Sequence, residues 1–185
     1  MLFIKKKITI GSFIRMFANE VLRVPAYSYE DYSTIDSKLK LSQKEFKLFN
    51  NNMSALRLLL LYAIFMDSKN RGQIMFSLDD FDETFIQAVS MSYQDNAVDQ
   101  AEAERLSEVF SQQLSSFTKY IKSISAKSLA EKGFTSHACL HFTYKYTKPS
   151  VDNAKNGTYI ALINNQRTLL IEYFEKALKK VKIIE

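Results

Sequence analysis

The strongest constraint on the fold is an unbroken apolar run at residues 58–66, LLLLYAIFM. On a helix such a run covers every face, and a helix that is apolar all round lies in a protein core or in a membrane. The run is about half of the roughly 20 residues that a helix needs to cross a bilayer. It therefore predicts the buried part of a core helix, and we expect no membrane-spanning segment.

A capping box marks the start of this helix. Ser42 is followed three residues later by Glu45, and in that arrangement each side chain satisfies an amide that the first turn leaves unpaired. The polar segment 67–72, which ends in Gly72, is typical of a helix end with a glycine just beyond it. We therefore expect a central helix over residues 43–67, one-sided in its first half and apolar all round after Arg57.

The remaining periodic stretches predict further helices around this one. The chain contains only four glycines and two prolines, which favours helices over a turn-rich β architecture. Apolar residues recur at helical steps over 10–24, from a capping pair at Ser77 and Asp80, over 97–125, and after Gly157. The sequence predicts an all-α fold, with residues 1–185 forming a single helical bundle of about five to six helices.

One segment, residues 134–147, fits two secondary structures. Its apolar residues alternate with polar ones, as on a strand, yet several of them also recur every fourth residue, as on a helix. We interpret it as a helix because the rest of the chain is helical. The alternative is an α+β fold with a small sheet from residues 2–10, 137–147 and 158–163.

Residues 25–41 are the longest predicted loop. They lack a sustained period, and Tyr27, Tyr29 and Tyr32 lie there beside two acidic residues. Amphipathic rings mixed with charge suit a partner-binding surface, so these tyrosines are the candidate binding residues. The alternative is that the rings fold back over an edge of the core and keep their hydroxyls in water.

Both histidines and the only cysteine lie together, as His137, Cys139 and His141. A single cysteine excludes an internal disulfide and a zinc site with several cysteines. On a strand all three side chains would share one face and could ligate a metal. On a helix only the two histidines would share a side, so we expect a polar face and no metal there.

The motif content gives little support to an enzyme. Phosphate-cradling loops need clustered glycines, and the glycines of this chain stand apart, which argues against nucleotide-binding loops. Ser116 and Lys119 match the Ser-x-x-Lys spacing of some acyl-transfer enzymes, but no companion motif accompanies them. We expect no catalytic site and no cofactor, with His137, Cys139 and His141 as the alternative enzyme or metal site.

The charge distribution keeps a second function class open. The chain carries a formal charge of +5, with basic residues at Lys5–Lys7 and along the end of the last predicted helix. Such segments can neutralise phosphates, so a helical nucleic-acid-binding regulator is an alternative. The sequence contains no zinc-finger spacing and no helix-turn-helix with a short glycine turn.

The function predicted from the sequence is that of a protein–protein interaction module: an adaptor, regulator or subunit. Its partner would be another protein or a second copy of itself. The amphipathic stripe over 97–125 is narrow enough to form a dimer seam, although such a stripe more often packs within its own chain, here on the central helix. The N-terminal residues are not a convincing secretion signal, so we expect a cytoplasmic location and no membrane partner.

Overall fold

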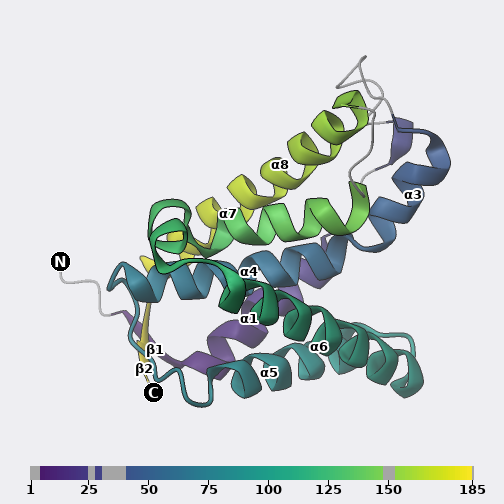
Figure 1. Ribbon diagram of the computed structural model, residues 1–185. Helices are drawn as coiled ribbons and strands as arrows, with labels where there is room; N and C mark the ends of the chain where they lie inside the picture. Colours follow the sequence, from purple (N-terminus) through teal and green to yellow (C-terminus); the bar gives the residue numbers. More distant parts are fainter. Residues whose placement is uncertain (1–4, 25–27, 31–40, 148–152, 185) are drawn as a thin grey trace.

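The computed structural model describes residues 5–24, 28–30, 41–147 and 153–184 (Figure 1). In chain order the elements are β1 (Lys6–Thr9), α1 (Ile10–Arg23), α3 (Gln43–Asn51), α4 (Met53–Asn70), α5 (Phe81–Asn96), α6 (Gln100–Ser123), α7 (Ala126–Thr147), α8 (Asn153–Leu178) and β2 (Val181–Ile184). The seven helices of these described residues confirm the prediction of a mainly α fold.

Helix α4 carries the apolar run and lies in the middle of the bundle. Helices α7 and α8 lie on one side of it, and α1, α5 and α6 lie on the other (Figure 1). Every residue from Leu58 to Phe65 is buried, which is why this helix tolerates apolar side chains on all its faces. In the ranges described, no helix combines the length and apolar content that a membrane crossing requires.

The predicted central helix over 43–67 is wrong in one respect: it is two helices. The capping box of Ser42 and Glu45 starts α3 as expected, and Asn52 then separates α3 from α4. The Asn52 side chain donates to the carbonyl of Leu48 at 2.8 Å. Asparagine side chains compete in this way for backbone groups, so the run Asn50–Asn52 is a poor helix interior and breaks the helix.

The start of α5 also differs from the prediction. The helix begins at Phe81 rather than Ser77, and Asp80 is its N-cap without a side-chain capping bond. The Ser77 hydroxyl instead accepts from the amide of Asp79 at 3.2 Å. This local turn satisfies the backbone in a non-helical form, so the expected capping box does not assemble.

The narrow apolar stripe of α6 packs inside the chain. Phe110, Leu114 and Phe117 are buried, and α6 contacts α4, α5 and α7. The Phe117 ring lies 6.3 Å from that of Tyr62 on α4, in an edge-to-face arrangement. The buried residues of the stripe are therefore occupied by packing within one chain.

Residues 134–147 are helical, as interpreted, but a break precedes them. Gly133 adopts φ 76°, so α7 is a short first part and a longer second part that begins at Phe134. The first amides of this second part point at a carboxylate of another helix. Asp67 of α4 accepts from the amide of Phe134 at 2.6 Å and from the amide of Thr135 at 3.0 Å. Asp67 thus caps α7 from α4.

Two features require glycine at position 133: its backbone conformation and the close approach of the Asp67 carboxylate. A Cβ atom at position 133 would lie 3.0 Å from Asp67 Oδ1, and φ is in the left-handed region. Gly133→Ala should therefore lower the free energy of unfolding by about 1–3 kcal/mol. Urea unfolding measures the change. In the matched variant Gly157→Ala the new Cβ meets nothing within 4 Å, and we expect little change or a small gain.

The α+β alternative is wrong in its composition, because residues 137–147 and 158–163 are helical. A two-stranded parallel sheet does exist: β1, within residues 2–10, pairs with β2, with Lys6 opposite Val181 and Thr9 opposite Ile184. The helical pattern after Gly157 predicts a last helix that continues through Val181, but this helix ends at Leu178. Val181, Ile183 and Ile184 are β-branched and favour a strand once β1 offers a partner.

Candidate functional site

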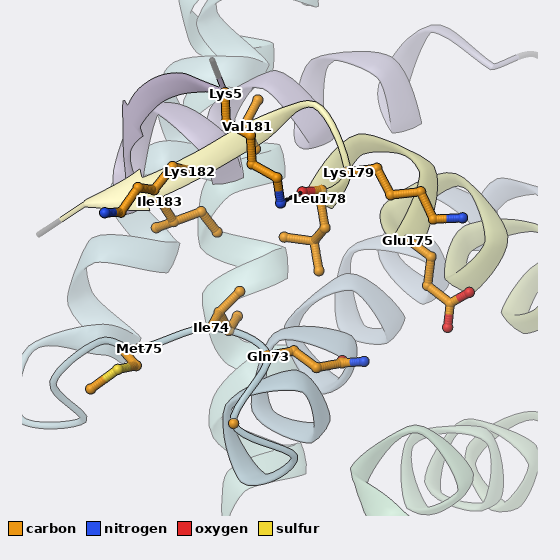
Figure 2. A pocket seen from close by; sticks show the side chains of 11 residues that line it. Lys5, Gln73, Ile74, Met75, Glu175, Leu178, Lys179, Val181, Lys182 and Ile183 are labelled. Atoms are coloured by element: carbon orange, nitrogen blue, oxygen red, sulfur yellow. Dashed lines mark hydrogen bonds between the residues drawn. The ribbon is translucent and has the colours of Figure 1, made fainter. Parts of the chain in front are cut away.

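A groove of about 820 Å³ opens on the described surface. The turn 72–76, which follows α4, forms one wall, and β2 with the end of α8 forms the other (Figure 2). The floor is apolar and includes Ile74, Leu178 and Ile183. Segments far apart in the sequence build this groove. No single stretch of the chain therefore predicts it.

Contacts hold the turn 72–76 at both of its ends. At the end of α4 the amide of Gly72 donates to Lys69 and the amide of Gln73 to Ser68, both at 2.9 Å, with Gly72 at φ 68°. This is a Schellman motif, and it confirms the predicted glycine stop. At the other end the Phe76 ring stacks on Phe81 with ring centroids 4.2 Å apart. The turn is thus preformed.

The turn presents one methionine to solvent. Ile74 and Phe76 are buried, so the residue between them in this extended segment points the other way. Met75 is accordingly 81% exposed. Its side chain points away from Leu178 (Figure 2). Lys69 reinforces this direction, because its ammonium group donates to the carbonyl of Phe76 and lies 4.7 Å from the ring centroid.

The opposite wall of the groove is basic. The sheet brings the N-terminal lysines beside those that follow α8, so that six exposed lysines meet at one corner: Lys5, Lys6, Lys7, Lys179, Lys180 and Lys182. Lys5 donates to the carbonyl of Leu178 at 3.1 Å. Within the described ranges none of the six forms an ion pair, and Glu175 is the acidic residue of the groove lining.

The two histidines lie between α6 and α7 and have separate surroundings. His137 is buried, and its Nδ1 lies 3.2 Å from the Tyr120 hydroxyl while its Nε2 lies 3.4 Å from the carbonyl of Ser128. His141 is half-buried, with Nε2 3.5 Å from the Ser116 hydroxyl. Among the residues described, no three His, Cys, Asp or Glu side chains are placed to hold a metal ion.

The Ser116 and His141 pair lacks the geometry of an activated nucleophile. The 3.5 Å separation is at the outer limit of a hydrogen bond. His141 lies beside the rings of Phe117 and Tyr120, and no carboxylate among the described residues bonds to it and orients it. Burial, with a smaller effect of Lys145, lowers the pKa of the His141 imidazole below its usual range. This arrangement suits a packed aromatic and polar cluster.

Cys139 faces away from this cluster, toward α8. It is buried and lines a hollow with Ile163 and Arg167. Burial raises the pKa of its thiol to about 11, although Arg167 acts in the opposite direction. The helix therefore separates Cys139 from the two histidines, as the helical interpretation predicts.

Thiol labelling tests this placement of Cys139. The thiolate is the reactive form, and at pH 8 a group with a pKa of about 11 is ionised about once in a thousand molecules. We expect labelling by a disulfide reagent to be at least about 100-fold slower in the native protein than in urea. Equal rates in the two conditions would show that the thiol is exposed.

A buried polar pair joins α4 to α8. Arg57 Nε donates to Gln166 Oε1 at 2.8 Å, and Arg57 Nη1 donates to the carbonyl of Val24 at 2.8 Å. Both side chains are 3% exposed. The sequence contains a sign of this pair, because Gln166 interrupts an otherwise apolar helix face, but it does not identify the partner.

Of the three tyrosines in the predicted binding surface, Tyr27 and Tyr32 lie outside the described residues. Tyr29 is half-buried; its hydroxyl donates to the carbonyl of Leu41 at 2.9 Å, and its ring lies 5.4 Å from that of Phe46. Tyr29 thus covers an edge of the core. Partner binding by the three tyrosines stays a prediction.

The chain matches no protein-family model, no curated protein and no solved structure. Its functional assignment therefore rests on the residues and geometry described above.

Proposed function

We propose that this chain is a cytoplasmic protein–protein interaction module, an adaptor, regulator or subunit, that binds a segment of a partner protein in the groove between the turn 72–76 and β2. The observation that carries the proposal is the preformed groove itself, with Met75 exposed on one wall and an apolar floor. Methionine is common on protein-binding surfaces because its flexible thioether adapts to different partners.

Two features of the fold favour the groove, rather than a helix face, as the binding surface. The apolar stripe of α6 is covered by the chain's own helices, so it is not available to a partner. The groove walls, in contrast, are held by backbone hydrogen bonds and ring stacking, and a preformed site loses less conformational entropy on binding.

A photo-crosslinker tests the proposal. We expect p-benzoylphenylalanine at position 75 to yield a discrete crosslinked product with a protein that mass spectrometry identifies. The matched control carries the crosslinker at position 98, where Val98 is 95% exposed outside the groove. The purified partner should then bind the chain directly, and Met75→Glu should weaken binding at least 10-fold. The same products from both positions, or none from position 75, would contradict the proposal.

The basic corner favours nucleic-acid binding as the second candidate function. The sheet joins the two basic segments that the sequence places at opposite ends of the chain, and six lysines in one place can neutralise several phosphates. If this candidate holds, the affinity for a 20-base-pair duplex falls steeply as salt rises, and Lys6→Glu with Lys180→Glu reduces the slope. No retention on immobilised DNA at low salt would eliminate it.

A further inference from the structure

The outer edge of β2 is an open strand edge beside the groove. The amide of Lys6 donates to the carbonyl of Lys180 at 3.3 Å, so Lys180 and Lys182 direct their backbone groups toward β1. Successive residues of a strand direct these groups to opposite sides. Val181 and Ile183 therefore direct their N–H and C=O groups away from β1, and no other strand pairs with them in the part of the chain that is described.

We infer, building on the proposed function, that the groove binds an extended acidic segment of a partner protein, in which acidic and apolar residues alternate, and that this segment adds to β2 as a third strand. Strand addition obtains its affinity from backbone hydrogen bonds and its specificity from alternate side chains. Here the backbone groups of Val181 and Ile183 supply the bonds. The apolar side chains of the segment would contact Ile74 and Leu178, which point into the space between the turn and the end of α8 (Figure 2).

The charge of the groove selects an acidic segment. Lys5, Lys179 and Lys182 line it, against Glu175 as the acidic lining residue. A strand with aspartate or glutamate on its outward face meets opposite charges across the new pair, whereas a basic strand meets like charges. Lysines on an edge strand also discourage pairing between copies of the same chain, because Lys182 of one copy would approach Lys182 of another.

The same lining argues against a nucleic acid as the occupant of the groove. Single-stranded nucleic acids stack on aromatic rings, and base edges of a duplex are read by bidentate contacts, most often from arginine or lysine. The groove lining contains neither an aromatic residue nor an arginine, and its floor is aliphatic. An acidic peptide uses both the lysines and the apolar floor, while a phosphate backbone uses only the lysines.

Selection from a peptide library tests this inference before any partner is identified. Random seven-residue peptides displayed on phage are selected on the full chain and counter-selected on a Lys179→Glu, Lys182→Glu variant. We expect enriched peptides in which Asp or Glu alternates with Val, Ile or Leu. The matched control is Lys127→Glu, an exposed lysine on α7 outside the groove, which should bind the same peptides unchanged. Circular dichroism verifies that all variants are folded.

Synthetic copies of the best peptide then test strand addition. We expect N-methylation of alternate backbone amides to weaken binding at least 10-fold when the methylated amides face β2 and little when they face away. The amides of Val181 and Ile183 should gain protection from hydrogen exchange in the complex. Equal affinity for both N-methylated forms, or for a lysine-substituted peptide, would overturn the inference.

The outcomes separate this inference from the proposed function. Selected peptides that occupy the groove without acidic enrichment overturn the acidic strand but leave the proposed function standing. The best peptide should bind the Met75→Glu variant more weakly whether or not it is acidic, since Met75 belongs to the groove lining. If no peptide depends on the groove, or if a DNA duplex binds there in preference to every peptide, the inference and the proposed function both fail.

Discussion

Leu60→Asp is expected to yield no folded protein. Leu60 is fully buried in the middle of α4, and the helices on both sides of α4 leave no path to water. An aspartate at this position would bury an unpaired charge and would also remove the packing of a leucine side chain. The combined cost, about 5 kcal/mol or more, is similar to the whole stability of an ordinary domain.

Soluble yield and circular dichroism measure this effect. Leu48→Asp is the matched control, because Leu48 lies on α3 with 59% of its surface exposed. We expect this control to fold with a change in the free energy of unfolding of about 0.5 kcal/mol or less. A folded Leu60→Asp protein would mean that α4 does not occupy the centre of the bundle.

Asp67→Ala is expected to lower the free energy of unfolding by about 3 kcal/mol. The carboxylate accepts from two backbone amides at the start of the second part of α7 and from the Thr135 hydroxyl at 2.8 Å. All three bonds are buried, and each donor left without a partner costs about 1–3 kcal/mol. Asp67→Asn should cost less, because its amide oxygen can still accept one of these bonds.

Urea unfolding of the two Asp67 variants gives this order directly. Glu131→Ala is the control, an exposed carboxylate removed from the first part of α7, and its effect should stay within about 0.5 kcal/mol. If Asp67→Ala and Glu131→Ala were equally stable, the capping of α7 by α4 would contribute nothing. Gly133→Ala should act on this same contact, so its effect should diminish in the Asp67→Ala background.

The groove shows why the binding surface is harder to predict than the helices. Turn 72–76 and β2 lie about a hundred residues apart in the sequence, and each is short. The buried pair Ile74 and Phe76, with Met75 between them, has the alternation of an extended segment, but three residues are too few to distinguish it from a loop. Val181 and Ile183 fit either a strand or the last turn of a helix.

The sequence by itself determined the class of the fold and its most buried helix. Unbroken apolar residues at 58–66 require enclosure, and the helical spacing in α1, α6 and α8 supplies faces that can provide it. Local chemistry also determined two boundaries, the capping box at Ser42 and the glycine stop at Gly72. These features depend on neighbours within about five residues.

Only the tertiary structure decided the contacts between distant residues. The sequence places Asp67 in a polar helix end but does not show that it caps α7. It shows that Gln166 interrupts an apolar face but does not identify Arg57 as its partner. β1 and β2 become strands because they meet, since an isolated strand leaves its backbone groups unpaired. A lone polar or β-branched residue is compatible with several partners, and the enclosure of α4 by the surrounding helices selects one.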